Sequence, residues 1–483
     1  MPREAPMRVQ EARGLICRAF TRFRSRSSKA ASTADSGTRP PSMAVSGDST
    51  VSSGMGPSVA PSHSSRCEGA WMPRTTRITI LLLFAAWVVD YIDRTVINFA
   101  LPSIGDDLGL DHTQQGLLVS VFFIAYALVQ IPGGLLADRY GALKVGIVGL
   151  TAWSIFTGLT AVAWSFAVLL AIRFLFGLVQ GVFPAAAIKA LAERSLPEQR
   201  TTAAGWTNSS NAAGLLLAAM IAGVMLPTVG WRVMFGVISV LGVAVILAWR
   251  RWMPEPLARD EIPVANVGAE AERRAVLLSP ALIGFAVIFF GYDVLVWGVT
   301  AWTPTFLHEQ RGISMAGIAF AAVPTTLAAA AGVVLGARLS DRIGGRPRVI
   351  VVPAMAFTAA MLFALPRAES FPLFVLLGTA MSLVAGMAYM PAFSVPLRSL
   401  PSSYIGAATG LIIFGGQLAG VASPLAFGVV TDHVSYTTAF ETMAIGPLLA
   451  LLAAAVVPQT ADAFRGTLAR RTSATVPSKE SLT

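Results

Sequence analysis

Charge is what this sequence has least of. Only 13% of its 483 residues are Asp, Glu, Lys or Arg, about half the share found in soluble globular proteins. Long uncharged stretches recur instead, as at 78–89, 116–137 and 145–172. Because roughly 20 apolar residues in a helix cross the hydrocarbon core of a bilayer, the sequence excludes a soluble protein. It predicts an all-α membrane protein with many crossings.

Cysteine and histidine are also scarce. The two cysteines, Cys17 and Cys67, both precede the first apolar stretch, and the four histidines are scattered along the chain. This pattern supports neither a disulfide framework nor a metal site. The sequence also lacks a nucleotide-binding loop and the motif of a nucleophilic triad. We therefore expect no enzyme, no catalytic residues, no cofactor, no metal and no direct use of ATP.

Basic residues exceed acidic ones, which gives a formal net charge of +10. About a third of the Lys and Arg residues precede residue 78, in a segment rich in Ser, Gly and Pro that is expected to be a disordered cytoplasmic tail. The tail has no apolar core typical of a signal peptide, and Met43, Met55 or Met72 would each be an alternative start. The remaining basic residues cluster in loops, which argues against nucleic acid as a partner.

Twelve apolar segments follow the tail, and we expect each to cross the membrane as a helix. They fall into two six-helix bundles, over 78–252 and 279–458, joined by a charged cytoplasmic linker at 253–278 and followed by a tail at 459–483. The expected spans are 78–101, 115–138, 142–164, 166–192, 202–226, 232–252, 279–303, 315–338, 347–366, 371–397, 403–430 and 437–458.

The orientation follows from the basic loops. Those after the second and eighth spans and the central linker carry most of the Arg and Lys, whereas the opposite loops carry only Arg232, Arg311 and Arg367. Cytoplasmic loops hold the excess of positive charge. Both termini are therefore expected in the cytoplasm, with the protein in the plasma membrane as a monomer.

One loop sequence occurs twice. "GGLLADRYGALK" ends the second span and "GARLSDRIGGRPR" ends the eighth, so the chain contains a duplicated six-helix unit, as transporters with two rocking halves do. The pair resembles the signature loop of the major facilitator superfamily over about residues 78–458. The resemblance implies that Asp138, Arg139, Asp341 and Arg342 gate the conformational change. In the family the acidic residue acts on the facing helix end across the bundle interface.

Charges inside the spans are the strongest functional signal, because one charge near the bilayer centre costs about 2.5–3.5 kcal/mol. "DYIDR" places Asp90, Asp93 and Arg94 in the first span. Asp90 and Arg94 are four residues apart and can pair on one helix face, which could be a self-neutralising structural contact. Asp93 is then left without a partner. A carboxylate in a partly dry cavity can take up a proton near neutral pH, so Asp93 is a candidate for proton coupling.

"RFLFGLVQG" places Arg173 and Gln180 seven residues apart in the fourth span, on one helix face. That face must meet a cavity, since an Arg side chain cannot face lipid. A guanidinium matches carboxylate or phosphate groups, so Arg173 together with Arg94 favours an anionic substrate. The alternative is that Arg173 only holds Asp93 or another helix.

In these charged motifs of the first and fourth spans, the chain resembles the anion:cation symporter branch of the superfamily, which includes transporters of sugar acids. Tyr91, Asp93 and Arg94 match its first helix, and "RFLFGLVQGVFPA" matches its fourth-helix pattern approximately, with the Pro one residue early. The resemblance implies that Arg94 and Arg173 contact the anion. It further implies that these residues line the cavity: Tyr91, Tyr126, Asn211 and Gln417.

Gln180 departs from that pattern, which has a titrating Glu there. Gln keeps the hydrogen bonds but cannot ionise. Either Asp93 carries the proton, alone or with Asp293 of the seventh span, or coupling is lost and the protein is a facilitator or exchanger. Asp293 could also be a hydrogen-bonded acid near the extracellular end. Tyr292 and Trp297 flank it as candidate lining residues.

These patterns predict proton-coupled symport of a small organic anion by alternating access. Sugar acids, aromatic acids and small dicarboxylates all satisfy two arginines and a polar cavity. Proton-driven efflux is a second possibility, although the fifth span, "GWTNSSNAAGLLLAAMIAGVMLP", has no Gly-Pro-rich motif. A sensor built on a transporter scaffold is a third, although neither tail resembles a folded domain.

Overall fold

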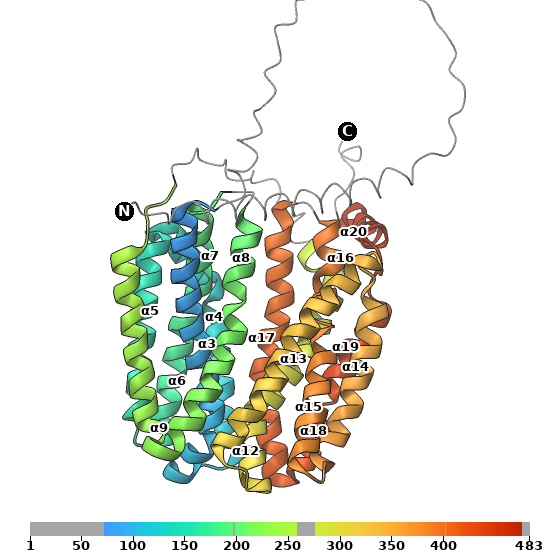
Figure 1. Cartoon of the computed structure of the whole chain (residues 1–483). Helices are drawn as coiled ribbons and strands as arrows, with labels where there is room; N and C mark the ends of the chain where they lie inside the picture. The colour runs from blue at the N-terminus through green and yellow to red at the C-terminus, as the bar shows by residue number, and fades with distance from the viewer. Residues whose placement is uncertain (1–71, 197–198, 258–275, 401, 476–483) are drawn as a thin grey trace, which may run out of the picture. The chain divides into compact units, whose positions relative to one another are not determined.

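The computed structural model describes residues 72–196, 199–257, 276–400 and 402–475, and the residues from Arg74 onward form one compact unit. Its described residues form helices and no strand (Figure 1). The all-α prediction is therefore confirmed. Most of the predicted N-terminal tail, the middle of the predicted linker and residues 476–483 lie outside the described residues.

The first half of the unit runs from α3 to α9. Asp111 caps α4 by accepting from the Gln114 N–H, and Gln114 returns the bond, which fixes the start of that helix. The predicted fourth span is two helices, because Pro184 cannot lie in a helix interior without clashing with the carbonyl four residues earlier. That carbonyl belongs to Gln180, the last residue of α6. The helices are α3 (Arg74–Leu108), α4 (His112–Tyr140), α5 (Ala142–Ala161), α6 (Phe166–Gln180), α7 (Phe183–Glu193), α8 (Arg200–Asn208) and α9 (Ser210–Trp252).

The second half repeats this order with more breaks. A π-helical turn, η3, interrupts the predicted seventh span directly after Asp293. A final helix, α20, lies within the segment predicted to be a tail. The elements are α11 (Pro280–Asp293), η3 (Val294–Val299), α12 (Thr300–Arg311), α13 (Met315–Arg342), α14 (Pro347–Ala364), η4 (Leu365–Arg367), α15 (Phe371–Gly386), α16 (Pro391–Ser399), α17 (Ser402–His433), α18 (Tyr436–Thr442), α19 (Ile445–Val456) and α20 (Ala461–Thr475).

Ten of the described segments are long and apolar enough to cross a membrane. The segment Thr202–Trp252 is 51 residues long, about 75 Å at 1.5 Å per residue, and Gly230 breaks it with a left-handed φ of 75°. The predicted first span lies in α3, which carries Asp90, Asp93 and Arg94 and is not among the ten. The number twelve stays a prediction.

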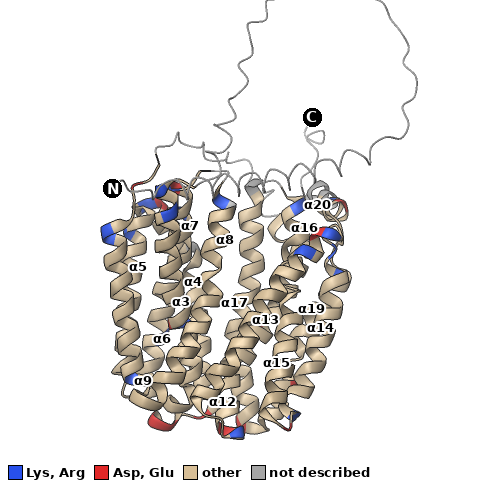
Figure 2. Ribbon diagram, viewed as in Figure 1, with Lys and Arg blue, Asp and Glu red and all other residues tan. Residues whose placement is uncertain are grey.

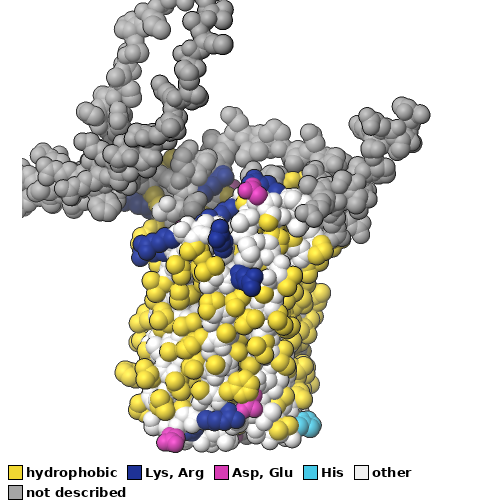
Figure 3. Space-filling model, turned by 90° about the vertical axis from the view of Figure 1, so that its right-hand side faces the viewer, with side chains coloured by type: hydrophobic (Ala, Val, Ile, Leu, Met, Phe, Trp, Pro, Cys, Tyr) yellow, Lys and Arg dark blue, Asp and Glu magenta, His cyan; other side chains and the backbone are white. Residues whose placement is uncertain are grey.

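Hydrophobic side chains cover the middle of the surface in Figure 3, and charged side chains lie toward its two ends. Leu81, Trp164, Phe320 and Val456 are each more than 65% exposed. Exposed apolar area of this kind is costly in water and suits contact with lipid tails. The surface and the helix lengths together describe a protein that passes through a membrane several times.

The two halves meet along α4 against α17, α9 against α13, and α3 against α12. Glycines allow the close approach: Gly116 lies against the backbone of Pro424, and Gly428 against the backbone of His112. Small residues at such crossings let helix backbones pack in membranes. Both contacts lie near the start of α4 and the end of α17, so the halves are in contact at that end.

Packing within the second half depends on Gly332 of α13. A Cβ at this position would overlap the carbonyl oxygen of Leu383 in α15, and backbone atoms cannot move aside without separating the helices. We expect Gly332→Ala to destabilise the protein by about 1–3 kcal/mol, measured as a lower thermal unfolding temperature in detergent. Gly236→Ala is the matched control, because nothing lies within 4 Å of its Cβ position. An equal unfolding temperature for both variants would contradict the prediction.

Candidate functional site

Arg94 on α3 is the centre of a buried polar cluster. Its Nη2 donates to Asp90 Oδ2 at 3.2 Å and its Nε donates to Gln180 Oε1 at 3.4 Å. Its guanidinium lies 4.6 Å from the ring centroid of Tyr126 and 5.3 Å from that of Tyr91. Aromatic faces stabilise a cation in dry surroundings. The predicted pair of Asp90 and Arg94 is present, but it is not isolated, because α6 and α4 both contribute to it.

Gln180 joins two helices at this point. Its Oε1 accepts from Arg94, and its Nε2 donates to the backbone carbonyl of Asp90 at 3.3 Å. The side chain is fully buried. Both ends of the amide are therefore used, which a deprotonated carboxylate could not achieve, because it has no hydrogen to donate.

Arg173 on α6 lies next to Asp93 on α3. Thr157 and Trp153 of α5, Arg173, and Asp90 of the same helix act on the Asp93 carboxylate, yet neither of its oxygens completes a hydrogen bond. Arg173 Nε also lacks a partner, and its guanidinium packs on Phe176 and Phe235 at 5.2 Å. Buried polar groups without partners are rare and costly. The Asp93 carboxylate can therefore accept a proton, and the Arg173 guanidinium can bind an anion.

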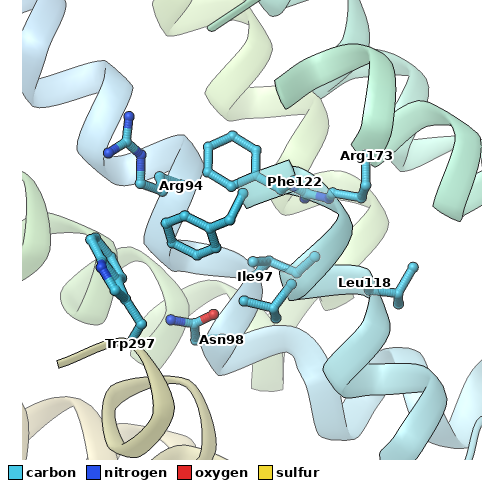
Figure 4. Close-up of a pocket in the computed structure, with 9 residues that line it drawn as sticks. Arg94, Ile97, Asn98, Leu118, Phe122, Arg173 and Trp297 are labelled. Carbon is cyan, nitrogen blue, oxygen red and sulfur yellow. The ribbon is translucent and has the colours of Figure 1, made fainter. Parts of the chain in front are cut away.

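Both arginines line one pocket (Figure 4). Phe122 of α4 lies beside Arg94, with 5.5 Å between the guanidinium and the ring centroid. Trp297 enters from η3, so both halves of the unit contribute to the lining. The lining consists of Arg94, Ile97, Asn98, Leu118, Val119, Phe122, Phe123, Arg173 and Trp297.

Sequence reasoning missed two of these lining residues that matter for chemistry. Asn98 is 5% exposed, and its Oδ1 has no hydrogen-bond partner, so the pocket contains a free polar group besides the arginines. Phe123 packs on Trp297 with 4.7 Å between ring centroids and so closes the pocket across the two halves. Asn98 lies four residues after Arg94, one helical turn away, and that spacing was a signal available in the sequence.

Asp293 lies at the break between α11 and η3. It is 7% exposed, its carboxylate packs against Gly416 of α17, and the Trp297 side chain acts on it. A single π-helical turn often marks a functional site, because it re-aims side chains. Gln417 follows Gly416, is buried, and its Oε1 has no partner. Asp293 and Gln417 are thus neighbours in the second half, whereas neither lines the pocket of Arg94 and Arg173.

Tyr292 belongs to an aromatic group that the sequence did not predict. Its ring lies 5.9 Å from Phe289 and 5.6 Å from Tyr389, the residue that follows α15 closely. Tyr389 also acts electrostatically on Tyr91 of the first half. Asn211 lies near the start of α9, one turn before Gly214, whose backbone packs on Tyr91. Tyr91 and Tyr126 contact Arg94, and neither they nor Asn211 and Tyr292 line the pocket itself.

The repeated loops form two matching ion pairs. Asp138 pairs with Lys189 of α7 at 2.8 Å, and Asp341 pairs with Arg398 of α16 at 2.6 Å. Each pair lies within its own half, and the two acidic side chains are 73% and 78% exposed. The expected contact of each acid with the facing half is therefore not made in this structure. Arg139 and Arg342 are exposed beside them.

A second polar cluster joins the halves at the opposite end of the helices. His112 at the start of α4 contacts Asp432 of α17 through Nδ1 at 2.7 Å and Glu309 of α12 through Nε2 at 3.0 Å. Asp432 also accepts from the N–H groups of His112 and Thr113. No group of His, Cys, Asp and Glu in the described ranges has the geometry of a metal site. Sequence patterns do not reveal this cluster, since Glu309 and Asp432 lie 197 and 320 positions after His112.

Comparison with known families identifies the fold. The model of the Major Facilitator Superfamily matches residues 83–424 and 314–479. The superfamily suggested by the repeated loop is confirmed.

Relatives of known name support the expected branch. The chain is 28% identical over 372 residues to the hexuronate transporter of Bacillus subtilis, covering 73% of this chain and 87% of that protein. It is 26% identical over 388 residues to a probable L-galactonate transporter of Escherichia coli, covering 74% and 85%. A probable sulfoacetate transporter of Cupriavidus necator is 28% identical over 405 residues, covering 78% and 92%.

Solved structures share the fold. A bacterial homologue of the lysosomal transporter Spinster, in an inward-facing and unoccupied conformation, aligns with a TM-score of 0.67 and 20% identity, covering 82% of this chain and 98% of that one. A D-xylose–proton symporter aligns with a TM-score of 0.65 and 16% identity, covering 79% and 98%.

Proposed function

The chain belongs to the Major Facilitator Superfamily, and we propose that it carries a small organic anion, of the sugar-acid class, by proton-coupled symport. Two buried arginines that line one pocket are the observation on which the proposal rests. A pocket with two guanidinium groups, an amide and several aromatic rings suits a carboxylate that also carries hydroxyl groups. The hexuronate and L-galactonate transporters among the relatives have substrates of that chemistry in their names.

The proton is proposed to bind Asp93, with Asp293 as a second carrier in the other half. Asp93 is 1% exposed, has no completed hydrogen bond and faces Arg173. An anion bound to Arg173 would remove the counter-charge of Asp93, so the carboxylate would take up a proton as the anion binds. Gln180 cannot take part in proton transfer.

Alternating access is proposed to use the two ends of the helices in turn. At the His112 end the halves are joined by polar contacts, and the acids of the repeated loops lie at the other end, each paired within its half. Lys and Arg gather at the end that carries α7, α8, α16 and α20 (Figure 2). By the positive-inside rule this end is cytoplasmic, in the plasma membrane, so the described state is closed to the outside.

Uptake by proteoliposomes tests the proposal. Purified protein is reconstituted, and a panel of D-glucuronate, L-galactonate, benzoate and succinate is offered with and without an inward proton gradient. We expect one of the two sugar acids to be concentrated only when the gradient is present. Equilibration without accumulation would favour the uncoupled facilitator, and movement of the anion against the direction of the proton flow would favour the efflux antiporter.

The polar contacts at the His112 end should hold the two halves together. Asp432→Asn keeps one acceptor oxygen but loses the other, together with the negative charge beside the His112 ring, and we expect the ratio of closed to open protein to fall about fivefold, or about 1 kcal/mol. Spin labels at Asp106→Cys and Val434→Cys would report longer distances. Glu441→Gln is the control, because its ion pair with Arg367 lies within the second half. Unchanged distances in Asp432→Asn would rule out this role.

A further inference from the structure

We infer that Asp90 is a second proton-binding carboxylate of the transport cycle, and that it exchanges Arg94 with the substrate anion. The inference rests on the proposed function, because it assigns a further residue to the same site. It places on α3 an acid that the family pattern places on α6, where this chain has Gln180.

The hydrogen bonds of Arg94 support this assignment. Arg94 has three neighbours with oxygen acceptors, the Asp90 carboxylate at 3.2 Å, the Gln180 amide at 3.4 Å and the Tyr126 hydroxyl. Of these, only Asp90 is a carboxylate, because the amide cannot ionise and a phenol ionises only in alkali. Gln180 is fixed by its bond to the Asp90 backbone carbonyl. The guanidinium of Arg94 thus has one carboxylate partner, from Asp90, and one amide partner, from Gln180.

The position of Asp90 suits competition with a substrate. Arg94 lines the pocket, and Asp90, one turn earlier on α3, does not. The Asp90 side chain is fully buried, and its Oδ1 has no hydrogen-bond partner. An anion in the pocket would therefore contact the Arg94 guanidinium while Asp90, outside the pocket, is still paired with that same guanidinium. Two carboxylates on one buried guanidinium leave an uncompensated negative charge, which is costly.

Proton uptake by Asp90 removes that cost. As the anion binds Arg94, the Asp90 carboxylate gains one proton from the water on the side of entry and becomes a neutral carboxylic acid. When the anion leaves on the other side, Asp90 releases the proton there and pairs with Arg94 again. Charge is balanced at each stage, and no covalent bond other than O–H forms or breaks.

Other ionisable groups near α3 do not replace Asp90 in this role. Along the helix itself and from α6 the neighbours are Tyr91, Asp93, Arg94 and Arg173, and α4 adds Tyr126. Tyr389 acts on Tyr91 from the second half. The charged groups of the other helices packed against α3 are engaged elsewhere: Lys189 with Asp138, Glu193 with Arg194, Arg200 with the Ala192 carbonyl, and Glu309 with His112. The first charged residue of α9 is Arg232, which pairs with Asp107.

The pH dependence of binding tests the inference. The dissociation constant for D-glucuronate is measured on the purified full chain by calorimetry across a series of pH values. In wild type, binding of the anion is coupled to protonation of Asp90 as well as of Asp93, so we expect affinity to fall as pH rises, up to about tenfold per pH unit more steeply than with Asp93 alone. Asp90→Asn should keep only the shallower dependence that is due to Asp93.

A charge exchange makes the test specific. Asp90→Asn/Gln180→Glu returns the acid to α6 and should restore the wild-type steepness, because the acid then again competes for Arg94. A slope in Asp90→Asn equal to that of wild type, or an affinity that no longer depends on pH in Asp93→Asn, would overturn the inference. Asp106→Asn, an exposed acid on the same helix, is the control and should behave as wild type.

A second readout separates failure of this inference from failure of the proposed function. Infrared difference spectra between acidic and alkaline pH detect protonated carboxylic acids without any ligand. The wild-type signal should lose one component in Asp90→Asn. If D-glucuronate neither binds nor exchanges, the proposed substrate class is wrong, and the infrared result still decides whether Asp90 takes up a proton. An identical spectrum in Asp90→Asn would refute the proton site itself.

Discussion

Arg173→Lys is expected to weaken the binding of a sugar acid by about 10- to 100-fold. Arg173 lies at the pocket with its Nε unpaired, and its guanidinium can offer two parallel N–H donors to a carboxylate. Lysine keeps the charge but offers a single point donor. Losing one hydrogen bond to a charged group costs about 1.5–3 kcal/mol, which corresponds to that range of affinity.

Binding of D-glucuronate by calorimetry checks this result, with counterflow exchange in proteoliposomes as a second measurement. Lysine still compensates the charge of Asp93, so the variant should fold, and its thermal unfolding temperature should stay near that of wild type. Arg251→Lys is the matched control, because Arg251 is exposed at the end of α9. Equal affinities in wild type and Arg173→Lys would mean that Arg173 only holds Asp93, the structural alternative that the sequence left open.

The buried charged residues are the part of the site that could be predicted from the sequence. A charge in an apolar helix must face a cavity or a partner, so Arg94, Asp93 and Arg173 were predictable from their own positions, and they do lie together. The repeated loop gave the fold in the same way, because duplication of a six-helix unit leaves a recognisable pattern. These signals are local, within one helix or one loop.

The contacts that depend on packing between distant helices were not predictable. The sequence could not show that the acids of the repeated loops pair with Lys189 and Arg398, since only the packing of α4 on α7 and of α13 on α16 brings these residues together. The same holds for His112 with Asp432. The break after Gln180 could have been predicted, because Pro184 forbids a continuous helix. The predicted fourth span nevertheless runs through this position.

Asp93→Asn is expected to lower accumulation of the anion about tenfold at a proton gradient of one pH unit, while leaving exchange of the anion within about threefold of wild type. Asn has nearly the same shape and cannot ionise. The variant carries one proton fewer with each anion, and Asp90 and Asp293 are the remaining carriers, so the same inward gradient should drive a smaller accumulation. Counterflow needs only the binding of the anion and the motion of the two halves, and so should persist. The measurement is uptake of D-glucuronate with and without a proton gradient, beside counterflow in the same vesicles.

Asp106→Asn is the control for this variant, since Asp106 is an exposed acid on the same helix and its loss should not affect accumulation.

Gln180→Glu adds an acid to the site, whereas Asp93→Asn removes one. Its new carboxylate would face Arg94 but would have to be protonated to keep the bond to the Asp90 carbonyl, so it adds a titrating group to a site that already has Asp90. If wild type only equilibrates the anion and Gln180→Glu creates accumulation, Asp93 is not a sufficient proton carrier and the chain is a facilitator. If wild type accumulates the anion and Asp93→Asn accumulates less of it, the acid that faces Arg173 carries one of the coupled protons.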